Sequence, residues 1–328
     1  AAAIGVKFAR ALNSGTSGLQ AILDYLDVRE REVLVPVNTF LATANAVIYA
    51  GGKPVFVDMS RDSLLLDFED LQRRITPKTK GVILVHLAGY IDENLEDLMS
   101  FCRKKGLFVM EDASHATGSA LGTKKAGSFG DAAAFSMLAT KVITSGGLGG
   151  MVVSNDEELI KRVTSLRFHG EEGVRGVQER LGYNWCMTEF QAIVGLTQLK
   201  RLDEIVEKRM KVARAYDEAF RNLRNVKIYP TREGNTNAYY KYPLTLMPPL
   251  RRLEVKERLD KEFAIASGTS YWPPCHLQPV YRKEFGYKEG DYPVAEDVLD
   301  RTISLPMFAS MTSEEIRRVI EAIVQICG

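Results

Sequence analysis

The sequence FSMLATK (135–141) joins a buried apolar run to a lysine, and a glycine-rich turn, GGLGG (146–150), follows it closely. A lysine in a loop after a buried strand, with glycines behind it that leave room for a ligand, is suited to forming an imine with a carbonyl group. A lone lysine is far more often a solvated surface charge. Lys141 therefore needs support from other parts of the chain before it is given a chemical role.

A carboxylate and a candidate phosphate loop lie upstream of Lys141. In FVMEDASH (108–115), Asp112 ends an apolar run, and open α/β sheets bind ligands at the carboxyl ends of their strands. The sequence NSGTSGL (13–19) opens a helical pattern, and the N–H groups and positive dipole end of a helix N-terminus suit a phosphate. Gly15 allows close approach, and Thr16 and Ser17 add hydroxyl donors. Taken singly, both features are more often ordinary helix caps.

The three features occur in the order that a type I pyridoxal-phosphate (PLP) fold needs. The phosphate loop comes first, then the strand-end acid, and then, about thirty residues later, the lysine. In such a fold Lys141 would carry PLP as a Schiff base, and Asp112 would pair with the pyridinium nitrogen. The combination favours a PLP site over the separate interpretation of these residues as a surface lysine and two helix caps.

Apolar runs alternate with amphipathic stretches over the first two thirds of the chain. This alternation predicts an α/β fold with a mostly parallel sheet that helices cover on both sides. We expect strands over EVLVP (32–36), KPVFVD (53–58), GVILVH (81–86), GLFVME (106–111), AAAFSM (132–137) and GGMVVS (149–154), with helices over 16–26, 40–50, 92–104 and 156–167.

A long helical pattern over 185–222 is expected to link two domains. Beyond it, KYPLTL (241–246) and the final TSEEIRRVIEAIVQI (312–326) indicate a smaller α+β unit. We therefore predict a large PLP-binding domain over residues 1–222 and a small C-terminal α+β domain over 223–328.

Composition excludes several classes of protein. The 43 basic and 42 acidic residues give a net charge of +1, whereas a nucleic-acid-binding protein usually carries a basic excess. No apolar run is long enough to span a bilayer, and the first residues do not form a secretory signal. The four cysteines and four histidines are scattered, so no metal site is expected. So few cysteines in a chain of this length fit a reducing cytoplasm.

Matching segments along the whole chain identify a resemblance to a known family. They are NSGTSGL (13–19), VPVNTFLATANAVIYAGGKPVFVDM (35–59), EDASHATGS (111–119), GSFGDAAAFSMLATK (127–141), LRFHG (166–170), GYNWCMTEFQAIVGLTQLKRLDE (182–204), HLQPVY (276–281) and SLPM (304–307). Together they resemble the DegT/DnrJ/EryC1/StrS aminotransferases, which are mostly sugar-nucleotide aminotransferases with the type I, aspartate-aminotransferase-like PLP fold.

The resemblance implies a role for each matching position. Lys141 matches the Schiff-base lysine, and Asp112 matches the partner of the pyridinium nitrogen. The phosphate is expected on the loop with Gly15, Thr16 and Ser17, and on Ser136. Phe40 matches the aromatic residue that stacks on the pyridine ring, and His115 stands beside the ring hydroxyl, where many members have Gln. Asn184 matches an asparagine that reaches the phosphate of the neighbouring subunit, which implies a homodimer with shared active sites.

Three departures from the family pattern concern the surroundings of the cofactor. Cys186 stands where Arg is usual, Leu148 stands where Glu is usual, and the turn KVITSGGLGGM (141–151) is one residue longer than the common pattern. They put local substrate contacts in doubt, whereas the cofactor residues match. Family members are also expected to carry a further stretch before a segment like FARALNSGT (8–16).

The implied activity is transfer of an amino group from glutamate to a nucleotide-linked keto-deoxy sugar. Three alternatives remain open: an aminotransferase for a cyclitol or free keto sugar, a related dehydratase, and a regulatory PLP-fold protein without turnover. Lys141 disfavours the dehydratases, which carry His at this position, and the pair of Lys141 and Asp112 disfavours a regulator without turnover. Candidate cations for a diphosphate are Arg167, Arg175, Lys241, Arg282 and Lys283.

Two further groups of residues have uncertain roles in the sequence. His86 ends an expected strand, and we interpret it as structural. The cluster YWPP (271–274) either lines a sugar pocket or packs the small domain.

Overall fold

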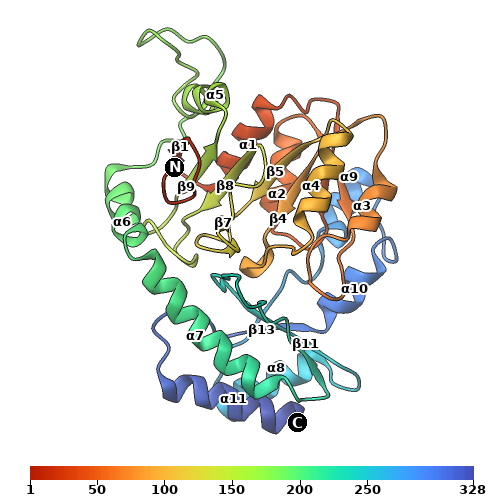
Figure 1. The fold of residues 1–328 in the computed structure, drawn as a ribbon. Helices are drawn as coiled ribbons and strands as arrows, with labels where there is room; N and C mark the ends of the chain where they lie inside the picture. Colours follow the sequence, from red (N-terminus) through yellow and green to blue (C-terminus); the bar gives the residue numbers. More distant parts are fainter.

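A seven-stranded sheet in the order β1-β9-β8-β5-β4-β2-β3 forms the centre of the computed structural model, which describes residues 1–328 (Figure 1). Neighbouring strands from β8 to β3 pair in parallel, and β9 runs antiparallel to both β8 and β1. The prediction of an α/β fold with a mostly parallel sheet is therefore confirmed. The strands are β1 (Phe8–Leu12), β2 (Glu32–Pro36), β3 (Lys53–Val57), β4 (Thr79–Val85), β5 (Phe108–Asp112), β8 (Ala132–Ser136) and β9 (Gly150–Ser154).

Helices cover both faces of the larger sheet, as its two-sided apolar strands require. On one face α1, α2 and α5 bury Leu19, Val47 and Val163 in the main core. On the other face α3 and α4 bury Leu71 and Leu98 in a second cluster. These helices are α1 (Gly15–Tyr25), α2 (Leu41–Tyr49), α3 (Phe68–Arg74), α4 (Leu95–Lys104) and α5 (Glu157–Arg167), with a short 3-10 turn, η1 (Leu87–Gly89), and a small hairpin of β6 (Ala120–Leu121) and β7 (Lys124–Lys125).

A smaller antiparallel sheet in the order β10-β11-β13-β12 forms the lower part of the molecule in Figure 1. The expected strand at 241–246 is β11, and the expected final helix is α11, which packs on this sheet. The elements are β10 (Val226–Lys227), β11 (Tyr242–Leu246), α8 (Arg252–Phe263), β12 (Gly268–Thr269), η2 (Cys275–Leu277), α9 (Pro279–Phe285), α10 (Pro293–Asp300), β13 (Thr302–Leu305) and α11 (Ser313–Cys327).

The helical pattern over 185–222 is helical in the structure but is divided into two helices. Helix α6 (Glu189–Leu199) starts at the Thr188 capping box, and α7 (Leu202–Phe220) starts after a break at Lys200–Arg201. Asp203 and Glu204 lie in the first turn of α7, where acidic side chains favour a new helix start. An apolar 3.6-residue pattern continues through such a break and does not reveal it.

Helix α7 connects the two sheets, as its position in Figure 1 shows. Its first half buries Leu202 and Val206 under the loop that follows β8, and its second half buries Tyr216 and Phe220 in the core of the smaller sheet. Helices α9 and α10 lie later in the chain but contribute to the main core of the larger sheet. The domain boundary at residue 222 stays a prediction.

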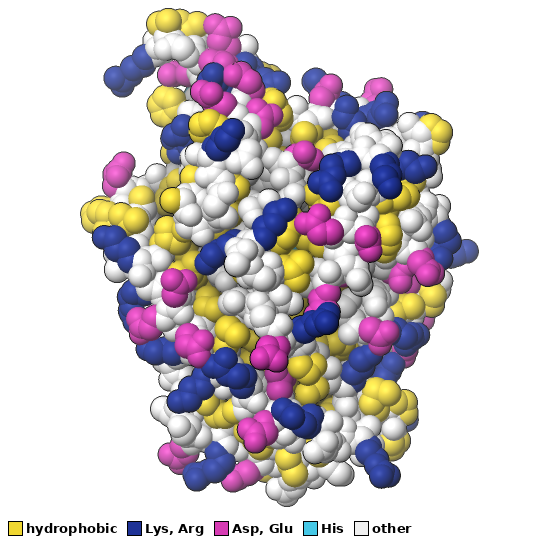
Figure 2. All heavy atoms as spheres, viewed as in Figure 1, with side chains coloured by type: hydrophobic (Ala, Val, Ile, Leu, Met, Phe, Trp, Pro, Cys, Tyr) yellow, Lys and Arg dark blue, Asp and Glu magenta, His cyan; other side chains and the backbone are white.

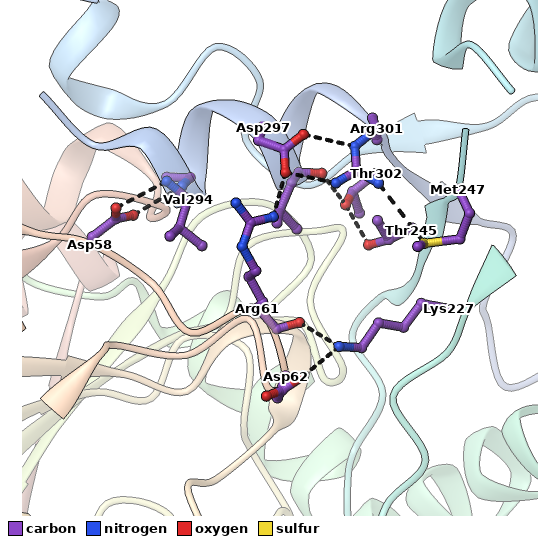
Figure 3. A network of polar contacts seen from close by, with 12 residues as sticks. Asp58, Arg61, Asp62, Lys227, Thr245, Met247, Val294, Asp297, Arg301 and Thr302 are labelled. Carbon is purple, nitrogen blue, oxygen red and sulfur yellow. Dashed lines mark hydrogen bonds and ion pairs between the residues drawn. The ribbon is translucent and has the colours of Figure 1, made fainter. Parts of the chain in front are cut away.

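Polar contacts join the two sheets near residues 58–62 (Figure 3). Lys227 Nζ donates to Arg61 O at 2.8 Å and to Asp62 Oδ1 at 2.6 Å. The Arg61 guanidinium pairs with Asp297, and the Asp58 carboxylate accepts the first N–H groups of α10. These contacts fix the small sheet next to the strand ends of the larger sheet. None of the helices is long and apolar enough to cross a membrane.

Candidate active site

A cavity of about 350 Å³ lies at the carboxyl ends of the parallel strands, between the two sheets. It contains seven of the nine predicted site residues. A larger hollow of about 730 Å³ lies among residues 60–69, 89–98 and 228–237, but it contains no lysine and none of the predicted residues. We therefore take the smaller cavity as the candidate site, because it holds the predicted reactive residues. The seven residues are Gly15, Thr16, Phe40, Asp112, His115, Ser136 and Lys141.

The N-terminus of α1 forms one end of the cavity. Ser14 caps the helix by accepting the N–H of Ser17 at 3.1 Å, and Ser14, Gly15 and Thr16 line the cavity. A Cβ atom on Gly15 would lie 3.1 Å from Ser136 Cβ, a tight contact, so the glycine lets the helix end lie close to β8. Free N–H groups, hydroxyls and the helix dipole together make this end suitable for a phosphate.

Gly150, at the start of β9, holds this helix end in place. A Cβ on Gly150 would lie 2.1 Å from the carbonyl oxygen of Ser14, which is a backbone contact that cannot be relieved by a rotamer change. The glycine-rich turn therefore lets β9 and the α1 N-terminus approach each other. Behind it, the Met137 N–H donates to Gly149 O at 2.8 Å and closes the loop that carries Lys141.

Asp112 is buried at the end of β5, and its two oxygens are held by hydrogen bonds. Thr43 Oγ1 donates to Asp112 Oδ2 at 2.7 Å, and the Ser114 N–H donates to Oδ1 at 3.1 Å. The preceding residue, Glu111, points to the opposite side and accepts three loop N–H groups as well as His86 Nε2 at 2.7 Å. His86 is thus a structural residue, and its pair with Glu111 fixes the strand end that presents Asp112.

Lys141 lies in the loop after β8, with Nζ 4.4 Å from the centroid of the Tyr240 ring. Burial lowers the pKa of Lys141 to about 8, Asp112 partly opposes this shift, and the charge of Lys241 adds to it. An amine with this pKa is partly neutral near pH 7, and the neutral form is the nucleophile. The cavity therefore contains one reactive amine and one fixed carboxylate.

His115 and Phe40 both line the cavity, and each lies near Tyr271. His115 Nδ1 accepts the N–H of Ala88 at 3.2 Å, and Nε2 lies 2.9 Å from Tyr271 Oη. His115 is therefore the residue that would be available to the ring hydroxyl of PLP. Phe40 is 57% exposed at the mouth of the cavity, with its ring 6.2 Å from that of Tyr271, so it is free to cover a planar ligand.

Two predicted residues do not line the cavity. Ser17 is buried in the first turn of α1, and its hydroxyl donates to Asn13 Oδ1 at 2.7 Å. Asn184 is exposed in the segment between α5 and α6 and does not line the cavity of its own chain. The roles of both residues toward the cofactor stay predictions, and the role expected for Asn184 lies in the site of a neighbouring subunit.

Several cavity residues escaped prediction as cofactor residues because they come from distant parts of the chain. Tyr240, Lys241 and Tyr271 line the cavity from the side of the smaller sheet. Tyr271 thus faces the site, whereas Trp272 packs at the edge of the main core. Of the five cations considered for a diphosphate, Lys241 alone lines this cavity. The only sequence signal for these residues was their aromatic or cationic type.

The departures from the family pattern lie in two different places. Leu148 lines the cavity and is 57% exposed, so it replaces a charged side chain with an apolar one at the mouth. Cys186 lies outside the cavity, in a separate hollow with Arg167, whose carbonyl oxygen is 3.6 Å from the Cys186 sulfur. The loss of the usual arginine therefore does not alter the lining of the cavity in the single chain.

The residues present fit PLP. The glycine-lined helix end suits its phosphate, the fixed carboxylate of Asp112 suits a protonated ring nitrogen, and Lys141 suits its aldehyde. The cavity is also large enough, since its volume of about 350 Å³ falls within the range of small-molecule binding sites.

Comparisons with known proteins cover nearly the whole chain. The model of the DegT/DnrJ/EryC1/StrS aminotransferase family matches residues 1–324. The spore coat polysaccharide biosynthesis protein SpsC of Bacillus subtilis is 35% identical over 342 residues, which cover 99% of this chain and 87% of the relative. A GDP-perosamine synthase of Escherichia coli O157:H7 is 31% identical over 320 residues, with 97% and 85% covered. The solved structure of DesV from S. venezuelae has a TM-score of 0.94 at 30% sequence identity. The match covers 99% of this chain and 86% of the DesV chain.

Proposed function

The chain belongs to the DegT/DnrJ/EryC1/StrS aminotransferase family and is a PLP-dependent aminotransferase, and on this basis we propose that it transfers an amino group from glutamate to a nucleotide-linked keto-deoxy sugar. The observation that supports this best is the convergence of Lys141, Asp112 and the α1 N-terminus on one cavity. The nucleotide-linked substrate rests on relatives, since the name of one of them is GDP-perosamine synthase.

Each cavity residue has a task in the proposed reaction. PLP, when bound, links reversibly to amines and withdraws electrons from the carbon beside the nitrogen. When PLP is bound, Lys141 would hold it through its Nζ, and the same Nζ, once released, would be placed to accept a proton from the amino donor. Asp112 would hold the proton on the ring nitrogen. Gly15, Thr16 and Ser136 would bind the phosphate, and Phe40 would cover the ring.

The active unit is proposed to be a homodimer with shared sites. Helix α6 buries only Gly195 and exposes Phe190 (84%), Ile193 (62%) and Leu196 (56%), which form a large apolar face. Figure 1 shows α6 at the left edge of the molecule. Asn184 lies on the segment that leads into α6 and is exposed. Figure 2 shows apolar side chains gathered at the same edge. A second copy on this face would cover it and bring Asn184 to the partner's phosphate.

The cytoplasm is the proposed location. None of the four cysteines forms a disulfide, and Cys102, Cys275 and Cys327 are buried. A reducing compartment suits such unpaired thiols.

The test of the proposed function separates the two half-reactions. Glutamate should convert the holoenzyme to its aminated form, visible in the absorption spectrum, with release of 2-oxoglutarate. The aminated form should then be discharged by a keto-deoxy sugar attached to a nucleoside diphosphate, and much more slowly by the same ketone without the nucleotide. Equal rates at equal concentration would favour the cyclitol or free-sugar alternative. No discharge by any ketone would contradict the proposal.

A further inference from the structure

Lys241 is a cation without a counterion in the lining of the cavity. It lies just before β11, is partly buried, and its Nζ donates one hydrogen bond, to Thr269 O at 2.9 Å. No carboxylate lies within ion-pair distance of it, although the chain forms many other ion pairs. Burial lowers the pKa of Lys241, in line with an uncompensated charge. Such a charge is costly unless an anion joins it, so the residue points to an anionic ligand group.

Tyr271 supplies a second donor at the same place. Lys241 Nζ lies 4.6 Å from the centroid of the Tyr271 ring. Burial, together with the charges of Lys141 and Lys241, lowers the pKa of His115 well below its usual value, so the ring is neutral. Because His115 Nδ1 accepts from Ala88, its Nε2 carries the proton and donates to Tyr271 Oη. The hydrogen of the Tyr271 hydroxyl is then free to donate to a ligand.

The position of Lys241 relative to Lys141 identifies the anion. Both ammonium groups lie over the same ring, at 4.4 Å and 5.9 Å from the centroid of Tyr240. An amino acid that donates its amine near Lys141 carries a carboxylate on the very next carbon. The diphosphate of a nucleotide sugar is separated from the keto carbon by several bonds. A cation that lies over the same ring as the reactive lysine, and whose charge lowers the pKa of that lysine, therefore fits the donor carboxylate better than the diphosphate.

We propose that Lys241 Nζ and Tyr271 Oη bind the α-carboxylate of the amino donor. This assignment rests on the proposed function and names a binding subsite within the same cavity. The two donors match the two oxygens of a carboxylate, and the charged hydrogen bond from Lys241 is the stronger contribution. In the alternative, purely structural role, the hydrogen bond from Lys241 to Thr269 O would only link β11 to the end of β12.

The test compares two inert ligands on the holoenzyme. α-Methylglutamate keeps the α-carboxylate but has no Cα proton to lose, and in 4-amino-4-methylpentanoate a methyl group replaces that carboxylate. Wild-type protein should bind the first more tightly by about tenfold or more, the factor expected for one charged hydrogen bond. Lys241→Met should abolish this preference, Tyr271→Phe should reduce it, and Lys241→Arg should retain it. Calorimetric titration gives the dissociation constants without any turnover.

A matched control and a stability measurement exclude a structural explanation. Lys211→Met removes the same charge from an exposed, unpaired position on α7 and should leave both dissociation constants unchanged. Lys241→Met should unfold at an equal or higher temperature than wild type, because a partly buried charge without a counterion is removed. A lower unfolding temperature would indicate the structural tie.

The outcomes of this test and of the proposed function are separable. Unchanged preference in Lys241→Met, or no preference in the wild type, would overturn the carboxylate subsite. Failure of the proposed function would appear as a wild-type holoenzyme that does not transfer an amino group from glutamate to any ketone. That result can occur with the carboxylate preference intact.

Discussion

Asp112 ends β5, and Lys141 lies in the loop after the neighbouring strand β8. Both reach one cavity because these strands end at the same edge of the sheet. Their surroundings give them different properties. Lys141 is partly desolvated and has a lowered pKa, whereas Asp112 is held by Thr43 and the Ser114 N–H. One group is therefore suited to covalent and proton-transfer chemistry, and the other to holding a positive charge in place.

Replacing Asp112 with Asn should slow the glutamate half-reaction by about a hundredfold or more. The neutral amide has the same shape but does not stabilise a protonated ring nitrogen. Single-turnover absorption measurements give the rate. Asp156→Asn makes the same change at the N-cap of α5, away from the cavity, and should leave the rate unaltered. A near-wild-type rate in Asp112→Asn would mean that another group protonates the ring.

Covalent capture of PLP by cofactor-free protein should depend on the pKa of Lys141. Burial lowers this pKa from 10.5 to about 8, so the neutral, reactive amine increases as the pH rises through about 8. The capture rate should increase from pH 6 to 9 and then level off. The same lowered pKa also affects the free energy of unfolding. Below pH 8 the charged, buried Lys141 destabilises the folded protein, and this destabilisation disappears as the pH rises toward 10.5. A rate that still rises steeply above pH 10 would contradict the lowered pKa.

Among the elements, the contact between β9 and the N-terminus of α1 does most to shape the phosphate end of the cavity. A Cβ on Gly150 would lie 2.1 Å from Ser14 O, so the two elements meet through backbone alone. The glycines that the sequence showed behind Lys141 thus leave room for a helix end as well as for a cofactor.

Gly150→Ala should weaken PLP binding by about tenfold or more, because the α1 N-terminus must move away from β9. Equilibrium titration of cofactor-free protein with PLP measures the dissociation constant. Gly147→Ala is the matched control in the same turn, since a Cβ there meets nothing within 4 Å, and it should bind PLP normally. Normal binding by both variants would show that the contact does not shape the site.

The sequence was sufficient to predict most of the larger sheet, because its central strands are apolar on both faces and the helices between them are amphipathic. It did not reveal β1, a partly exposed edge strand, or the break between α6 and α7. The site was predicted where residues follow strand ends or open a helix. Lys241 and Tyr271 reach the cavity through the packing of the smaller sheet, which no local pattern encodes.

The molecule as a whole has an exposed apolar face on α6, and Asn184, which is proposed to contact the phosphate of a partner, does not line the cavity of its own chain. Both features are explained if two copies associate through this face. The chain on its own would then lack one contact to the phosphate.

Mixing two inactive variants tests the shared site. Lys141→Ala and Asn184→Ala homodimers should each have little or no activity, because each lacks one component of both sites. Random pairing in co-expressed chains gives half mixed dimers with one intact site each, so about a quarter of wild-type activity should return. Two different affinity tags on the two chains allow the mixed dimers to be isolated by sequential purification. Mixed dimers without activity, or a fully active monomer, would contradict shared sites.

The central claim is that Lys141 carries the cofactor, and borohydride reduction of the holoenzyme tests it most directly. Reduction fixes PLP to the amine that holds it, and peptide mapping by mass spectrometry then locates the label. The account predicts a pyridoxyl group on the peptide that contains Lys141, and no label on Lys241 or any other lysine. Lys141→Ala should lose the label while still binding some PLP through the α1 N-terminus. A label on a different lysine in the wild-type protein would contradict the account.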